Sequence, residues 1–202
     1  MVHNKTRKRR QTTPKETVYS IEEYNSNDGM LTTVWGPGMW HYLHTMSFNY
    51  PVNPTKEDKH NYMKFMLNLK NVLPCGKCRK NLRKNFKRLP LKMEHMETRE
   101  TFSKYVYNLH ELVNNMLGKT SGLTYEDVRE RYEHFRARCV QPIPNSLVTC
   151  KNTTCKKGKK LELGCTEPLY GKKAKCILKI VPHDEKVETL QIDKNCIKKK
   201  IV

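Results

Sequence analysis

The chain has 202 residues, of which 39 are Lys or Arg and 20 are Asp or Glu, so its formal net charge is +19. This length fits one domain of ordinary size with extensions, or a small pair of domains. The longest apolar runs are far shorter than the roughly 18 to 20 residues of a membrane-spanning helix, so we expect no membrane span. The six basic residues among the first fifteen have no apolar stretch after them, which predicts no secretory signal.

The charge and composition divide the chain into three parts. Residues 1–33 carry six basic and four acidic side chains, residues 34–139 carry 19 and 10, and residues 140–202 carry 14 and 6. The first part is polar and poor in large apolar residues, which is typical of a flexible arm. We therefore expect a basic N-terminal arm at 1–33, a folded domain at 34–139, and a basic Cys-containing extension at 140–202.

The central part is predicted to be helical. Apolar residues recur there at spacings of three and four, between capping and breaking residues, and predict helices over 36–46, 61–73, 75–86, 98–117 and 124–138. Thr55 and Asp58 supply a start signal for the second helix, and Pro74 ends it. Five helices in about a hundred residues predict an all-α fold, a four-helix bundle with a fifth short helix.

The C-terminal extension has a different pattern. Residues 176–181 and 187–192 are rich in β-branched residues that roughly alternate with polar ones, and 182–186 has the composition of a turn. This pattern predicts a β-hairpin, which is marginal alone and needs a staple or a partner surface.

Cys75 and Cys78 lie three residues apart at the start of a predicted helix, on one face and close enough for a disulfide. The free amides of the helix N-terminus, with Lys77, Arg79 and Lys80 nearby, should stabilise a thiolate. Half of a zinc site is the alternative, but no second pair of ligands follows at finger spacing. A redox-active dithiol is therefore the favoured interpretation of this pair.

The densest run of positive charge surrounds these cysteines. Between Lys59 and Met93 there is no acidic residue and there are eleven Lys or Arg, eight of them from Lys77 to Lys92. Such a run is usually a solvated helix face or a phosphate-binding surface, and here it can also favour the thiolate.

Several separated motifs occur together around the Cys pair. They are Trp35-Gly36-Pro37-Gly38-Met39-Trp40, Leu43-His44, Tyr50-Pro51, Leu73-Pro74-Cys75-x-x-Cys78-Arg79, and Leu109-His110-x-x-Val113-Asn114-x-x-Leu117-Gly118-Lys119. In order and spacing they resemble the Erv/ALR family of FAD-linked sulfhydryl oxidases over about residues 34–139. Pro37 and Glu111 stand where cellular members have Arg and Asn, and these departures are more similar to members carried by large DNA viruses.

The resemblance implies an enzyme that binds FAD and forms disulfide bonds in protein thiols, with O2 as acceptor and H2O2 as product. It implies that Cys75 and Cys78 are the catalytic pair, with Cys75 exchanging with incoming thiols and Cys78 beside the flavin. Tyr132 and Arg131 look similar to an aromatic and a basic residue that, in the family, border the adenine end of FAD. The implied cofactor-binding residues are Gly36, Trp40, His44, Cys78, His110, Val113, Asn114, Lys119 and Tyr132, with no metal ligand. The resemblance also implies a homodimer formed through the first two helices.

Trp40, His44 and His110 have a plainer interpretation, because a lone Trp or His on an amphipathic helix is more often part of the core. The spacing of four between Trp40 and His44, repeated between His110 and Asn114, places each pair on a shared helix face. Their joint occurrence around a C-x-x-C favours the cofactor role.

Six further cysteines have no assigned role. Structural disulfides are the favoured interpretation, followed by an electron relay, for which Cys150 and Cys155 are the closest pair, and by a four-thiol zinc site of Cys150, Cys155, Cys165 and Cys176. The full set is Cys139, Cys150, Cys155, Cys165, Cys176 and Cys196.

Two other function classes compete with the oxidase. A basic helical module that binds nucleic acid, with structural cysteines, is the alternative, and it predicts a colourless protein with strongly salt-dependent binding. A thioredoxin-like protein needs βαβ units, which this helical pattern excludes. We expect the oxidase in the cytoplasm of a host cell, at the site of virus assembly, and in the virion.

Overall fold

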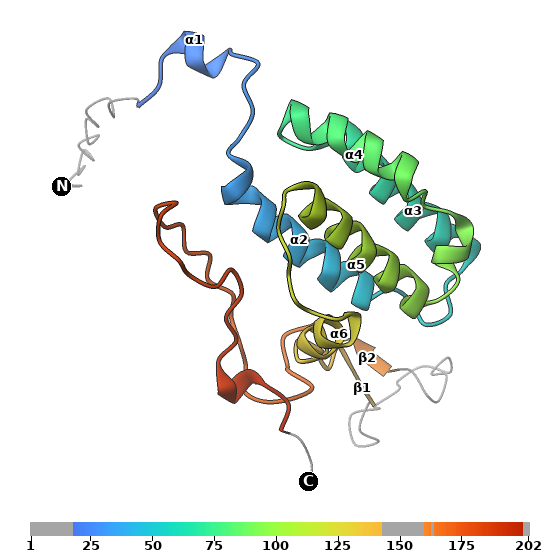
Figure 1. The fold of residues 1–202 in the computed structure, drawn as a ribbon. Helices are drawn as coiled ribbons and strands as arrows, with labels where there is room; N and C mark the ends of the chain where they lie inside the picture. The colour runs from blue at the N-terminus through green and yellow to red at the C-terminus, as the bar shows by residue number, and fades with distance from the viewer. Residues whose placement is uncertain (1–17, 143–159, 163, 200–202) are drawn as a thin grey trace, which may run out of the picture.

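The computed structural model describes residues 18–142, 160–162 and 164–199. Figure 1 shows α2 beside α5 and α3 beside α4, with α6 below the end of the bundle. The helices are α1 (Ile21–Tyr24), α2 (Thr32–Phe48), α3 (Lys56–Val72), α4 (Gly76–Arg88), the 3-10 helix η1 (Met93–Met96), α5 (Arg99–Met116), α6 (Tyr125–Glu133) and the 3-10 helix η3 (Lys194–Cys196). The strands are β1 (Val140–Pro142) and β2 (Lys160–Glu162).

Local capping explains where the helices of the bundle begin. At the start of α3 the Thr55 hydroxyl accepts from the Asp58 amide at 3.0 Å, and the Asp58 carboxylate accepts from the Thr55 amide at 2.9 Å. Thr124 and Asp127 form the same reciprocal pair before α6. The prediction of an all-α bundle with a short fifth helix is confirmed, and no helix in the described ranges is long and apolar enough to span a bilayer.

The core lies between α2, α3, α4 and α5. Fully buried aromatic side chains occupy its centre, and the two tyrosines among them donate their hydroxyls to backbone carbonyls. The Tyr50 hydroxyl donates to the Met96 carbonyl at 2.9 Å, and the Tyr105 hydroxyl donates to the Leu89 carbonyl at 2.9 Å. These bonds fix the ends of α2 and α4 against η1 and α5, and so hold the helices that carry the site.

Most helix boundaries lie within two residues of the sequence prediction, with the second helix starting at its Thr55 and Asp58 signal, but two differ by a turn or more. Helix α2 begins at Thr32 rather than at Gly36, and Pro37 lies inside it. The added turn forms because the Leu31 carbonyl accepts from the amides of Val34 and Trp35, at 3.0 and 3.3 Å. Helix α6 ends at residue 133 rather than 138, because the chain that follows pairs with a later segment.

The predicted hairpin at 176–192 is wrong. A turn does form there, with the Glu185 amide donating to the Pro182 carbonyl at 3.2 Å, but neither flank is a strand. The side chains of Ile177, Leu178 and Ile180 are 75%, 68% and 65% exposed, so the apolar residues lack a surface to pack on.

A two-stranded ribbon forms elsewhere, from residues 136–142 with residues 160–162 and 164–169. Strands β1 and β2 pair antiparallel, and Ala137 bridges Pro168 beyond them. A disulfide joins Cys139 to Cys165 with the Cα atoms 4.5 Å apart, which supplies the staple that an isolated ribbon needs. This bond confirms the structural disulfide interpretation for two of the six cysteines and removes Cys165 from the four-thiol zinc alternative.

The other four cysteines fall into two sets, one inside and one outside the described residues. Cys176 and Cys196 have no disulfide partner within the part of the chain that the structure describes. Cys150 and Cys155 lie outside the described residues, so the relay interpretation that rests on them stays a prediction.

Candidate redox site

A disulfide closes the first turn of α4. Cys75 is the N-cap residue, and its Sγ accepts from the Cys78 amide at 3.2 Å. The two cysteines are bonded to each other with their Cα atoms 5.1 Å apart, so the prediction that this spacing suits a disulfide is confirmed. Pro74 ends α3, and the Cys75 amide donates to the Leu73 carbonyl at 2.8 Å, which turns the chain directly into α4.

The surroundings of this disulfide are electropositive. Lys77 and Lys80 are exposed on the first turn of α4, and the Arg79 guanidinium donates to the Leu73 carbonyl next to the Cys pair. The first turn of α4 carries no acidic residue. When the disulfide is reduced, these cations and the amides of the helix N-terminus favour the thiolate over the thiol.

The segment just before α2 packs against the disulfide, which the sequence did not predict. The Met30 amide donates to the Pro74 carbonyl at 2.9 Å. A Cβ on Gly29 would lie 2.8 Å from the Pro74 carbonyl oxygen and 3.1 Å from the Cys75 Cα, so only glycine fits this approach. The prediction that all of 1–33 is a flexible arm is therefore wrong for its last residues.

Two side chains complete this contact. The Trp35 indole donates to the Met30 carbonyl at 3.1 Å. The Thr32 hydroxyl lies 3.6 Å from the Cys78 Sγ, and because that sulfur is in a disulfide the hydroxyl is the donor. The segment 29–32 thus contacts both cysteines of the pair. A lone glycine among polar residues gave no sequence signal for this role.

A cluster of aromatic and imidazole rings joins α2 to α5. The rings of Trp40 and His110 are stacked, with centroids 4.0 Å apart and an interplanar angle of 8°. His44 Nε2 and His110 Nδ1 are hydrogen-bonded at 2.9 Å. The structure therefore brings together the three ring-bearing residues that the resemblance singled out on these two helices.

Both imidazoles of the cluster are held neutral. Burial, with smaller effects from the nearby His110 and His41, lowers the pKa of His44 to about 3. Burial also lowers the pKa of His110 to about 4. The buried His44 Nδ1 has no hydrogen-bond partner among the described residues, so this cluster has one polar atom available to a bound group.

The other predicted cofactor residues on α2 and α5, and just after α5, differ in their exposure to solvent. Gly36 lies one turn before Trp40 on α2 and is half-buried, as are Val113 and Asn114 on α5. The Asn114 amide donates to the Glu111 carboxylate at 2.9 Å. Lys119 is exposed just beyond the end of α5, and none of its described contacts reaches the rings.

Tyr132, from α6, is buried on the far side of the cluster. Its ring centroid lies 5.3 Å from that of His44, and its hydroxyl lies 3.3 Å from His41 Nδ1. The sequence did not single out His41, although its position beside Trp40 on an otherwise apolar helix was a usable signal. It also gave no sign of Arg136, which donates to the carbonyl of Phe48 at 2.6 Å and fixes the chain after α6 to the end of α2.

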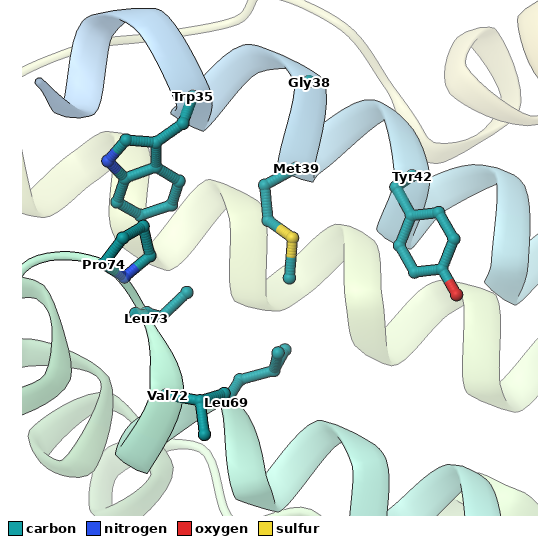
Figure 2. A pocket seen from close by; sticks show the side chains of 8 residues that line it. All are labelled: Trp35, Gly38, Met39, Tyr42, Leu69, Val72, Leu73 and Pro74. Carbon is teal, nitrogen blue, oxygen red and sulfur yellow. The ribbon is translucent and has the colours of Figure 1, made fainter. Parts of the chain in front are cut away.

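An apolar pocket of about 460 Å³ lies between α2 and α3, next to the Cys pair. Figure 2 shows Trp35 and Pro74 at one end, Met39 near the middle and Tyr42 at the other end. The α2 residues of this pocket recur at spacings of three and four, and so occupy a different face of the helix from Trp40 and His44. The pocket is therefore separate from the ring cluster.

An all-α bundle with a disulfide across the first turn of a helix defines a helical thiol–disulfide redox domain. The sequence profile of the Erv1 / Alr family matches residues 37–133. A protein of Acanthamoeba polyphaga mimivirus, named as a probable FAD-linked sulfhydryl oxidase, is 39% identical over 99 residues, which cover 49% of this chain and 68% of that protein. The chain belongs to the Erv1 / Alr family.

Other relatives extend the similarity. An Arabidopsis thaliana FAD-linked sulfhydryl oxidase is 30% identical over 84 residues, and this match spans 42% of each chain. An FAD-linked sulfhydryl oxidase of African swine fever virus is 27% identical over 107 residues, which cover 53% of this chain and 87% of that protein. The crystal structure of the yeast Erv1 core aligns with a TM-score of 0.44 and 22% identity, over 63% of this chain and 92% of that one.

Proposed function

We propose that this protein is an FAD-linked sulfhydryl oxidase that forms disulfide bonds in protein thiols, with O2 as the acceptor and H2O2 as the product. The observation that carries the proposal is the Cys75–Cys78 disulfide at the start of α4, in a chain that belongs to the Erv1 / Alr family. Relatives in a virus and in a plant are named for this activity. We propose residues 34–139 as the catalytic domain.

The proposed exchange begins when a substrate thiolate attacks Cys75 Sγ. A bond forms between the substrate sulfur and Cys75, the Cys75–Cys78 bond breaks, and Cys78 leaves as a thiolate. A second substrate thiolate then attacks the substrate sulfur of this mixed disulfide, which releases the substrate as a disulfide and Cys75 as a thiolate. Two electrons have passed from substrate to the Cys pair, and the cationic start of α4 stabilises the thiolates produced.

FAD, when bound, supplies the two-electron acceptor that restores the Cys75–Cys78 disulfide and passes the electrons to O2. The ring cluster fits such a group, because Trp40 offers an aromatic surface and the buried His44 Nδ1 lacks a partner. The neutral imidazoles of His44 and His110 can donate or accept hydrogen bonds without adding charge. With Gly36, Val113, Asn114, Lys119 and Tyr132, these residues would hold the cofactor.

The test is a spectrum followed by oxygen uptake. The purified protein should be yellow, with a flavin absorption band, and should consume O2 when given dithiothreitol. Cys75→Ser and Cys78→Ser should each abolish this uptake while they retain the flavin, because each removes one half of the exchanging pair. Undiminished uptake in both variants, or a colourless protein without uptake, would contradict the proposal.

We also propose a homodimer, with the apolar face of α2 and α3 as its interface. This face includes the pocket in Figure 2, and the side chains of Tyr42 and Val72 are 53% and 61% exposed on it. Tyr42→Asp should shift the protein from dimer to monomer in light-scattering measurements. We also propose that the protein acts in the cytoplasm of a host cell, at the site of virus assembly, and in the virion, which is what the resemblance to viral family members implies.

A further inference from the structure

The exposed face of α4 carries positive charge without compensation. None of the exposed Lys and Arg side chains of α4 forms an ion pair within the described ranges. Ion pairs do occur elsewhere on the bundle, such as Lys59 with Glu97. The nearest carboxylate in sequence is Glu94, which pairs with Lys92 beyond the helix. The exposed cations are Lys77, Lys80, Arg83, Lys84, Lys87 and Arg88.

These cations begin at the disulfide itself. Lys77 lies between the two cysteines, and residues three, seven and ten positions later continue the same face of the helix. With a rise of about 1.5 Å per residue, Lys84 lies roughly 9 Å and Lys87 roughly 14 Å along the axis from Cys78. A ligand bound along this face therefore reaches the sulfur atoms at one end.

The opposite approach to the disulfide is covered. The segment 29–32 contacts Pro74, Cys75 and Cys78, as described above. Gly76 and Lys77, in contrast, are exposed, and a Cβ on Gly76 would meet no backbone atom, only the side chain of Arg79 at 3.6 Å. A partner that reaches Cys75 from the open side passes over the cations of α4.

We infer that the basic face of α4 recruits thiol substrates whose cysteines lie next to acidic residues. This inference rests on the proposed oxidase function and names the substrate class that the site selects. An acidic protein segment accounts for both features of α4, since its carboxylates pair with the cations and its thiolate meets Cys75. A nucleic acid accounts for the charge alone and would place phosphates, which carry no thiol, over the disulfide.

The expected contribution is to encounter rate and salt dependence, because exposed charges act mainly on association. The variant Lys84→Gln/Lys87→Gln/Arg88→Gln removes three exposed charges from the part of α4 beyond the Cys pair and keeps good helix-forming residues. Its matched control, Lys172→Gln/Lys175→Gln/Lys179→Gln, removes three exposed charges from the C-terminal extension. Both variants keep Lys77, Arg79, Lys80 and the Cys pair, and both have the same net charge.

The probes are two synthetic dithiol peptides of equal length, one with Asp and Glu around its cysteines and the other with Lys. At low salt, kcat/KM for the acidic peptide should exceed that for the basic one and should fall about tenfold in the α4 variant. The control variant should stay near the wild type. Turnover of dithiothreitol, which is uncharged, should be the same in all three proteins.

A binding measurement separates failure of this inference from failure of the proposed function. A labelled acidic peptide with Ser in place of Cys should bind the wild type and the control, and should bind the α4 variant about tenfold more weakly. Equal affinity for the acidic and basic peptides would overturn the inference, even in an active oxidase. The inference would also be overturned if the α4 variant bound oligothymidylate more weakly than the wild type but bound the acidic peptide equally well. Retained peptide selectivity in a protein without oxidase activity would reject the proposed function alone.

Discussion

The start of α4 and the ring cluster between α2 and α5 differ in exposure and in the charge of their side chains. The first is half-exposed, surrounded by cations and able to hold thiolates. The second centres on the buried His44, with Trp40 and His110 half-buried around it, and keeps two imidazoles neutral. A thiol exchange reaction needs an accessible electrophilic sulfur, while an electron acceptor is best held where water and charge are excluded. Thiol exchange is therefore suited to the exposed, positively charged start of α4, and electron acceptance to the uncharged ring cluster around His44.

The largest expected effect is a difference between Cys75 and Cys78 in their rate of reaction with oxidised glutathione. In Cys78→Ser the remaining Cys75 thiol should trap a stable mixed disulfide with oxidised glutathione, because the resolving thiol is missing. In Cys75→Ser the Cys78 thiol should react at least tenfold more slowly, because the Thr32 hydroxyl lies over its sulfur. Mass spectrometry over time measures both rates, and equal trapping by the two variants would refute this division of roles.

The next effect concerns pH and the buried imidazoles. The folded pKa of His44 is about 3, below the ordinary value of 6.5, so the unfolded chain binds more protons than the folded one between these values. The contribution of His44 to stability is thus complete above pH 6.5 and is lost progressively as the pH falls toward 3. At pH 5 the loss from His44 should be about 2 kcal/mol in the free energy of unfolding.

Urea unfolding at pH 7.5 and pH 5 measures this loss. His44→Phe should remove the same share of the pH dependence, and His44→Gln serves the same purpose if the larger side chain is not accommodated. His60, which is exposed on α3, provides the matched control as His60→Gln. An unchanged difference between the two pH values in both His44 variants would show that this imidazole is not buried as neutral.

The smallest expected effect tests the segment that covers the disulfide. In Gly29→Ala the new Cβ would lie 2.8 Å from the Pro74 carbonyl oxygen, so the segment 29–32 must move away. The rate of disulfide exchange with glutathione should rise a few-fold, because Cys75 and Cys78 become more accessible. Gly38→Ala, where a Cβ meets nothing within 4 Å, is the control, and equal rates in the two variants would indicate that the segment does not limit access.

The sequence by itself determined the helices and the redox pair, because both depend on residues close together in the chain. Thr55 with Asp58, Thr124 with Asp127, and the stop at Pro74 act within one or two helical turns. The pairing of Cys75 with Cys78 follows equally from their spacing on one turn. These features depend only on residues that are close together in the sequence, so periodicity and capping patterns are sufficient to predict them.

The tertiary structure alone decided what packs on these elements. The contact of Gly29 with Cys75, the bond between His44 and His110, and the ribbon around Cys139 join residues between 26 and 66 positions apart. The predicted hairpin at 176–192 failed for the same reason, since a strand pattern becomes a sheet only where a partner surface exists. Burial and pairing depend on the whole fold, and no local pattern specifies which distant segment will fill a given surface.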